Sequence, residues 1–185
     1  MSDVSEDLHG LLFGIQRSVR YHSRREQFFD RFNTFVTVLN LILGSATILT
    51  FAAEFAKDWA LWAKLLPAAA VTVLSSIDLV IGSARMARTH NDLAREFIVL
   101  EKEVRTSKVS ELTEEDIANF TGRRLDIEMK EPPVKLVLDS ICHNELLKAS
   151  GYDAAEYLKI GRLQAFFAQL IDITPSSITK AVSAT

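Results

Sequence analysis

Two long apolar segments, joined by a short turn, restrict what this chain can fold into more than any other feature. Residues 32–53 contain 22 positions without a charged side chain, and residues 65–84 contain 20 positions with one ionisable group, Asp78. As a helix the first segment is about 33 Å long, which matches the roughly 30 Å hydrocarbon core of a bilayer. We therefore expect a transmembrane helical hairpin. The alternative is a buried hairpin inside a soluble protein, which seldom needs apolar segments of this length.

The positive charges lie on the two outer flanks of this hairpin. Five arginines precede the first segment and six Lys or Arg residues follow the second within residues 85–108, whereas the connecting turn holds only Lys57 and Lys64. Because the cytoplasmic flanks of membrane spans are enriched in Lys and Arg, both termini are expected in the cytoplasm. The sequence thus predicts a multi-pass protein with two spans and a small external loop.

The predicted fold class is all-α: a membrane protein with a two-helix transmembrane hairpin, cytoplasmic coiled-coil-like helix extensions and a C-terminal helical segment. The expected segments are a cytoplasmic N-terminal helix (1–31), transmembrane helix 1 (32–56), an external turn (57–63), transmembrane helix 2 (64–84), a cytoplasmic helical extension (85–112), a cytoplasmic helical segment (113–175) and a tail (176–185). The second transmembrane helix is expected to continue into the extension without a break.

Helix-start and helix-stop signals divide the C-terminal segment. The signals are a capping box at Thr113 and Asp116 that opens a helix toward Met129, a helix start at Pro132 and Pro133, a helix end at Gly151, and a last helix from Asp153 to just before Pro175. The apolar face of this last helix is expected to be buried against the preceding helices or a neighbouring subunit.

One face of the first apolar segment is polar or small. The residues at alternating spacings of four and three are Asn33, Thr37, Asn40, Gly44 and Thr47. Asn and Thr side chains can bond across helices, and glycine lets two backbones approach, so this face can form a helix–helix interface. A water-lined path is the second interpretation, and both stay open.

Asp78 is the most informative residue of the second segment, with Ser75 on the same helix face. An aspartate near the centre of a span costs roughly 2.5–3.5 kcal/mol on insertion scales, so its side chain needs a compensating role. One role is a structural bond to Asn33, Thr37 or Asn40 of the first span. The other is a place in a hydrated lumen, where a ring of carboxylates would attract cations.

Apolar residues at heptad spacing suggest contacts between helices outside the membrane. The candidate oligomer seam consists of Leu93, Phe97, Leu100 and Val104 after the second span, and Leu163, Phe167 and Leu170 in the last helix. His22 and His90 occupy seam positions, where they would either confer pH sensitivity or pack as neutral side chains.

No motif for catalysis, cofactor binding or metal binding occurs in the sequence. The single Cys142 cannot form an intramolecular disulfide, and Cys142, His143 and Glu145 point in divergent directions on a helix. The net charge of −3 argues against nucleic-acid binding, which needs a concentrated basic face. We therefore expect a protein that is not an enzyme and that needs no cofactor.

Several strings of the chain, in their order and spacing, resemble the SLATT family of bacterial two-transmembrane effectors that associate with SMODS and SLOG proteins. They are RYHSRREQFF with VLNLILGSA, then LSSIDLVIGSARMARTHNDLAREFIVLEKEV, and RRLDIEMKEPPVKLVLDSICHNELLKASG in the tail. The resemblance implies an inner-membrane effector of antiviral defence that forms a pore or disrupts the membrane, in the manner of abortive infection.

This resemblance also implies partners. Two spans are too few to enclose a pore, so a homo-oligomer in contact with membrane lipid is expected. The activating signal is expected from a separately encoded sensor or from a nucleotide. The alternative function is a non-conducting oligomeric membrane anchor that serves as a scaffold for a soluble defence partner.

Overall fold

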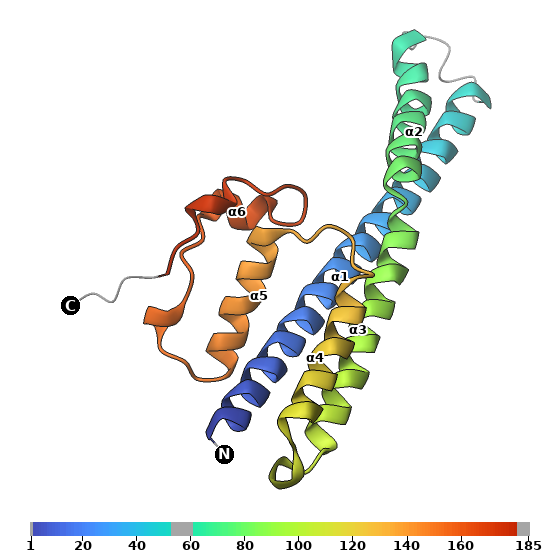
Figure 1. The fold of residues 1–185 in the computed structure, drawn as a ribbon. Helices are drawn as coiled ribbons and strands as arrows, with labels where there is room; N and C mark the ends of the chain where they lie inside the picture. Colours follow the sequence, from blue (N-terminus) through green and yellow to red (C-terminus); the bar gives the residue numbers. More distant parts are fainter. Residues whose placement is uncertain (1, 53–60, 181–185) are drawn as a thin grey trace. The chain divides into compact units, whose positions relative to one another are not determined.

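The computed structural model describes residues 2–52 and 61–180, and these residues form an all-helical protein (Figure 1). The predicted all-α fold class is thereby confirmed. Side chains at 2, 3, 47, 50–52, 61–64 and 110 lie outside the description. The helices are α1 (Ser2–Ala52), α2 (Leu61–Ile81), α3 (Ser83–Thr106), α4 (Glu114–Glu128), α5 (Leu136–Ala149) and α6 (Arg162–Phe167), with single turns of 3-10 helix at Val109–Glu111, Ala154–Glu156 and Pro175–Ser177.

The chain divides into two compact units. Met1–Arg25 and His90–Thr185 form one unit, which we call the helical domain, and Glu26–Thr89 form the other, which we call the hairpin unit. Helices α1 and α3 each contribute to both units.

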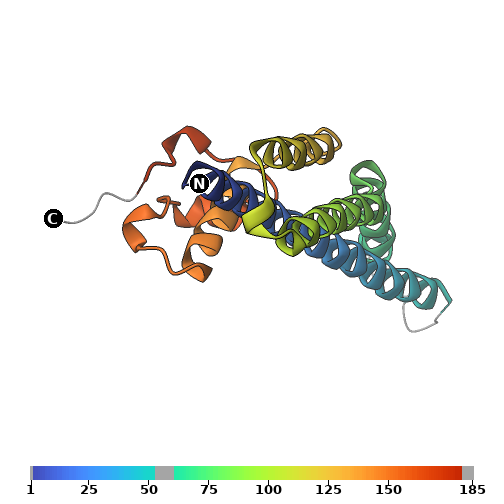
Figure 2. The same ribbon diagram turned by 60° about the horizontal axis from the view of Figure 1, so that its bottom comes forward.

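The helical domain has two apolar clusters on two sides of α1. Figures 1 and 2 show α4 beside α3, and α5 beside the N-terminal part of α1. The first cluster joins α1, α3 and α4 through Leu8, Leu11, Ile15, Leu93, Phe97, Leu100, Val104, Ile117 and Ile127. The second joins α1, α5 and the end of α6 through Tyr21, Val137, Leu138, Cys142 and Ala168.

The first cluster contains four members of the candidate oligomer seam. Leu93, Phe97, Leu100 and Val104 are buried within the chain itself, against α1 and α4. A contact between subunits through these side chains stays an untested prediction, and it would require this core to open. Leu163 and Leu170 are the seam members that lie exposed on the surface.

The hairpin unit consists of the second part of α1, all of α2 and the start of α3. Its large apolar side chains point outward on both long helices, and Leu79 and Val80 are each 84% exposed. Within the described residues, one helical stretch, Leu65–Thr106, is long and apolar enough to cross a membrane, as judged by length and composition. This stretch includes the predicted transmembrane helix 2, but the predicted hairpin of two spans is not confirmed by this criterion. Residues 53–60, between the two apolar segments, lie outside the described residues.

Three predicted helix boundaries differ from the structure. The second apolar helix does not continue unbroken: α2 ends at Ile81, and Gly82, at φ 63°, separates it from α3. The prolines at 132 and 133 do not start a helix; α5 begins at Leu136, because Tyr21 Oη and the Asp172 carboxylate accept the first N–H groups of that turn.

The predicted last helix is also much shorter than expected. Asp153 caps only one turn of 3-10 helix through the N–H of Ala155, and α6 covers Arg162–Phe167. The chain between them is extended because Asn144 of α5 bonds both the N–H and the C=O of Leu158. The capping box at Thr113 and Asp116 and the glycine turn at Gly151, at φ 78°, are confirmed.

Candidate functional site

Polar side chains of the hairpin unit contact one another at two levels, that is, at two positions along the helix axes. At the first level, Asn40 Nδ2 of α1 donates a hydrogen bond to Ser75 Oγ of α2 over 3.0 Å. This bond joins the two antiparallel helices of the hairpin at positions that the sequence singled out. The polar face of the first segment therefore serves, at this level, as a helix–helix contact.

At the second level, the Asp78 carboxylate accepts a short hydrogen bond from Ser83 Oγ. Ser83 is fully buried, and its hydroxyl also lies 3.4 Å from Asn33 Oδ1 of α1. A serine hydroxyl has one proton to donate, and the charged acceptor at the shorter distance takes it. Ser83 thus occupies the space between the carboxylate of α2 and the amide of α1.

Gly82 makes this arrangement possible. Its N–H donates to Asp78 C=O over 2.7 Å, and its φ of 63° turns the chain so that Ser83, the first residue of α3, faces back toward Asp78. A residue with a Cβ would be strained at this backbone angle. The same corner borders an open cavity of about 360 Å³ that Asp78, Gly82, Arg85 and others line.

The structure brings four of the six predicted intramembrane polar residues together. Asn40 donates to Ser75, and Asn33 Oδ1 lies 3.4 Å from the Ser83 hydroxyl that bonds Asp78. Thr37 is exposed, and the side chain of Thr47 lies outside the described residues. The hydrogen bond that the Asp78 carboxylate accepts comes from Ser83, at the start of α3, and not from Asn33, Thr37 or Asn40 of the first span as considered above. This contact is a structural bond, but its partner differs from the predicted ones.

Sequence reasoning missed Ser83 as a member of this site. The available signal was the Gly-Ser pair at the end of the second apolar segment, five residues after the only carboxylate in it. A glycine at that position predicts a local change of backbone direction, and a small hydroxyl residue directly after it can bond back into the preceding turn.

A second polar cluster lies inside the helical domain. The Nδ1 atoms of His22 and His90 are 2.9 Å apart, and His22 Nε2 lies 2.9 Å from Glu131 Oε1. Because a carboxylate can only accept, His22 carries its proton on Nε2, and its Nδ1 then accepts the Nδ1–H of His90. The ring of His22 also stacks on Phe97 with centroids 5.6 Å apart.

Burial governs the protonation of His90. Desolvation lowers the pKa of His90 to about 3, and the neighbouring charges act in the same direction. The imidazole of His90 is therefore neutral throughout the physiological range. Between the two roles considered for His90, this pKa favours a packed neutral side chain over a sensor of mild acidification.

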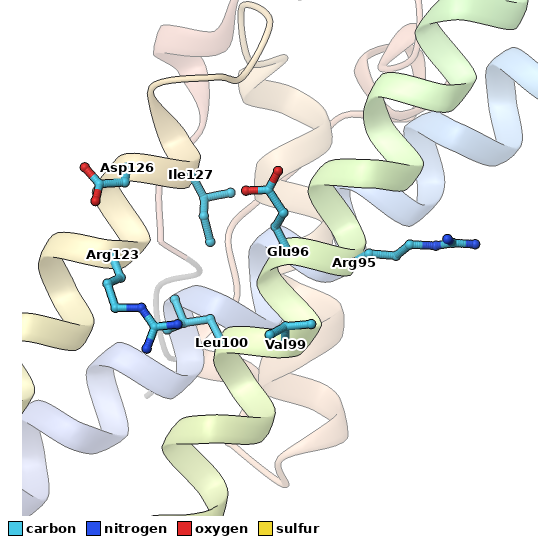
Figure 3. A pocket seen from close by; sticks show the side chains of 7 residues that line it. All are labelled: Arg95, Glu96, Val99, Leu100, Arg123, Asp126 and Ile127. Atoms are coloured by element: carbon cyan, nitrogen blue, oxygen red, sulfur yellow. The ribbon is translucent and has the colours of Figure 1, made fainter.

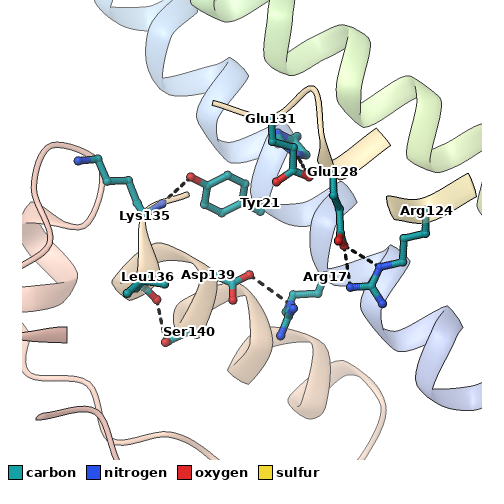
Figure 4. Close-up of polar contacts among 10 residues, drawn as sticks. Arg17, Tyr21, Arg124, Glu128, Glu131, Lys135, Leu136, Asp139 and Ser140 are labelled. Atoms are coloured by element: carbon teal, nitrogen blue, oxygen red, sulfur yellow. Dashed lines mark hydrogen bonds and ion pairs between the residues drawn. The ribbon is translucent and has the colours of Figure 1, made fainter. Parts of the chain in front are cut away.

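Polar contacts around Tyr21 hold α5 and the preceding loop against α1 (Figure 4). Tyr21 Oη accepts the backbone N–H of Lys135 over 2.9 Å, and Arg17 Nε lies 3.2 Å from the Asp139 carboxylate. Burial raises the pKa of Asp139, and the positive charge of Arg17 offsets part of this shift. Nearby on α4, Arg124 pairs with Glu128 one turn later. These contacts are structural, since they join elements of one core.

A shallow groove of about 390 Å³ lies between α3 and α4, with Val99, Leu100 and Ile127 among its apolar lining residues (Figure 3). Arg123 at its rim is held by Glu103, and this hydrogen bond raises the pKa of the guanidinium and lowers that of the carboxylate.

Cys142 has the properties of a core residue. Its side chain is fully buried in the second apolar cluster, and burial raises the pKa of its thiol to about 12. A neutral thiol in an apolar core is a poor nucleophile.

Nothing among the known family models, the curated proteins or the solved structures matches this chain. The resemblance to the SLATT family stays an interpretation of the sequence.

Proposed function

We propose that the hairpin unit is embedded in the inner membrane as two spans, with both termini of the chain in the cytoplasm. The observation that carries this proposal is the outward direction of the large apolar side chains on α1 and α2, including Leu41, Ile42, Leu79 and Val80. Soluble monomers rarely expose contiguous apolar patches larger than a few hundred Å². In a bilayer the same side chains contact lipid, and the polar groups pair inside the hairpin.

The orientation follows from the charges on the two ends of the hairpin unit. Arg31 precedes the first span, and Arg85 and Arg88 follow the second, whereas the connecting turn is poor in cations. Anionic lipid and the membrane potential hold such cationic flanks in the cytoplasm.

Cysteine labelling in intact cells tests the topology. Single cysteines replace Ser5, Asp58 and Ser176, and a membrane-impermeant maleimide is expected to label only the position at 58. The native Cys142 gives little background, because its thiol is buried and its pKa is about 12. If the cysteines at positions 5 and 176 are labelled and the cysteine at position 58 is not, the proposed orientation is wrong.

Within this membrane we propose that several copies assemble into an effector that permeabilises the bilayer when a sensor partner or a nucleotide signal activates it. The resemblance to SLATT proteins supports this activity, as does the presence of two spans per copy, too few to enclose a path alone. The resulting ion leak would arrest the growth of the infected cell.

The second candidate function is a non-conducting membrane anchor that holds a soluble defence partner. The pairing of Asn40 with Ser75, and of Asp78 with Ser83, favours this candidate, because these polar groups are engaged inside one copy of the hairpin. A lumen would need polar groups that remain available to water and ions.

Flux measurements separate the two candidates. Purified protein is reconstituted into liposomes loaded with a potassium-sensitive dye, together with a candidate sensor protein or a candidate nucleotide signal. Effector activity predicts dye response on activation, accompanied by membrane depolarisation and growth arrest when both genes are induced in cells. An activated, correctly inserted protein that passes no ions would discard the pore and support the anchor.

A further inference from the structure

Helix α6 and the turn that follows it, residues 163–171, present an apolar face to the outside of the helical domain. Four large side chains, Leu163, Phe166, Leu170 and Ile171, are more than half exposed, with Phe166 at 78%. The opposite face is fixed inward: Gln164 donates to Ile173 C=O and Ser177 Oγ, and Ala168 lies in the second apolar cluster. The helix therefore cannot rotate to bury its apolar face without breaking these contacts.

The charge around this face is suited to an anionic surface. Lys159 and Arg162 precede it within a few residues, and both are exposed. The nearest acidic side chains are already engaged within the chain: Asp172 accepts the N–H groups of Leu136 and Val137, and Glu156 pairs with Lys180. An apolar face of Leu and Phe bordered by cations is the pattern of helices that lie in a membrane interface.

The chain directly after α6 is bonded to a residue of α1 that precedes the first apolar segment in the sequence. Arg25 of α1 donates hydrogen bonds to the backbone oxygen and the side-chain oxygen of Gln169, just after α6. Phe32, where the uncharged segment begins, follows Arg25 by seven residues in the sequence. The end of α6 is thus tied to a residue that the proposed topology puts close to the cytoplasmic membrane surface.

We propose that α6 inserts its apolar face into the headgroup region of the cytoplasmic leaflet, with Lys159 and Arg162 on anionic lipid phosphates. This inference rests on the membrane location proposed above. A second copy of the chain is the competing occupant, but a stable protein–protein interface takes about 20–30 residues on each side, far more than this face offers. Lipid insertion needs only the face itself, because the spans already hold the protein at the membrane.

Depth-dependent fluorescence quenching tests the inference on the full-length protein. Trp59 and Trp62 are replaced with Phe, and single tryptophans are introduced as Phe166→Trp, Leu125→Trp or Leu79→Trp. Each variant is reconstituted into phosphatidylethanolamine–phosphatidylglycerol vesicles that contain lipid brominated either near the headgroup or deep in the acyl chain. Leu125, on α4, is the matched control, since it is an apolar residue of the same domain and is 53% exposed.

The expected result is that Phe166→Trp loses fluorescence to shallow bromines and Leu125→Trp does not. Adding Lys159→Gln and Arg162→Gln should reduce this loss in anionic vesicles and leave it unchanged in phosphatidylcholine vesicles. Leu79→Trp tests the membrane location of the hairpin unit separately from the insertion of α6. If brominated lipid does not quench the fluorescence of Leu79→Trp, the membrane location is wrong. Quenching at Leu79→Trp with none at Phe166→Trp overturns only the α6 inference. A concentration-dependent blue shift at Phe166→Trp without quenching would assign the face to a second copy.

Discussion

At the scale of single residues, the buried imidazole of His90 couples the stability of the helical domain to pH. Its pKa is about 3 in the folded protein and 6.5 in the unfolded chain, so between these values the unfolded chain binds more protons. This contribution to stability is complete above pH 6.5 and decreases as the pH falls toward 3. The slope from one such site is at most about 1.4 kcal/mol per pH unit.

Thermal unfolding in detergent, followed by circular dichroism across this range, measures the effect. The parent midpoint is expected to decrease with acidification, and His90→Gln is expected to flatten that decrease, since the glutamine amide can still donate to His22. His9→Gln is the control, because His9 bonds Tyr152 in an exposed position. An acid dependence that His90→Gln leaves unchanged would assign the proton uptake to other groups.

Ser83 decides whether the Asp78 carboxylate has a partner inside the hairpin. Ser83→Ala removes the hydroxyl and leaves a partly buried charged acceptor without it, at a cost of about 1–3 kcal/mol. Amide hydrogen exchange of peptides from Glu26–Thr89 in nanodiscs should then accelerate, by roughly tenfold per 1.4 kcal/mol.

Ser76→Ala provides the matched control for this substitution. The Ser76 hydroxyl donates to Thr72 C=O in its own helix and is exposed, so its loss should leave exchange almost unchanged. If Ser83→Ala and Ser76→Ala accelerate amide hydrogen exchange equally, the hydrogen bond from Ser83 to Asp78 stabilises the hairpin unit no more than the bond of an exposed serine does.

The candidate site was predictable from sequence only for residues whose chemistry is exceptional in an apolar segment. Asp78, Asn33, Asn40 and Ser75 stand out because each carries a polar group where lipid is expected. Ser83 does not stand out, since serine is common at the ends of spans, and its role depends on the φ of Gly82. A backbone angle at one glycine is a property of the fold that residue spacing does not encode.

At the scale of elements, α3 packs its heptad face into the helical domain. Phe97 is fully buried between α1 and α4 and stacks on His22. Phe97→Ala removes this side chain from a packed core and should cost about 3–5 kcal/mol of unfolding free energy. Ile98→Ala, at the next position and 48% exposed, should cost much less.

The labelling rate of the Cys142 thiol measures this loss of unfolding free energy. Cys142 is buried in the second apolar cluster of the same domain, so it reacts only when the domain opens. In mild denaturant at constant pH, its labelling rate should rise strongly in Phe97→Ala and little in Ile98→Ala. Similar rates in both variants would mean that Phe97 is not part of the cooperative core.

Elements with strong local signals were predicted well, and those set by distant contacts were not. The capping box of α4 at Thr113 involves only neighbouring residues. The start of α5 depends on Tyr21 and Asp172, and the extended chain before α6 depends on Asn144, all far away in sequence. Heptad spacing predicted the buried face of α3, but spacing does not say whether the partner helix belongs to the same chain.

At the scale of the whole molecule, the role of Asp78 decides between a charged lumen and a structural contact. Asp78→Asn keeps an oxygen that can accept the Ser83 hydroxyl and removes the charge, whereas Asp78→Leu removes both. Because Asp78 bonds Ser83 within one copy, we expect Asp78→Asn to assemble and to retain the parent's flux from liposomes. Asp78→Leu should impair folding and assembly, because the Ser83 hydroxyl then loses its carboxylate acceptor and retains only the 3.4 Å contact with Asn33 Oδ1.

The flux of the parent, Asp78→Asn and Asp78→Leu is compared at equal membrane levels and in the presence of the activating signal. The mass of the oligomer in detergent and growth arrest on induction are measured for the same three proteins. If Asp78→Asn assembles normally but passes fewer cations than the parent, the carboxylates of several copies must face a shared lumen, where their charge favours cations. That result would overturn the structural role assigned to Asp78. If both variants match the parent in assembly, the Ser83 contact contributes little, and the desolvation cost of the carboxylate must be met by water or by a lipid headgroup at the same depth.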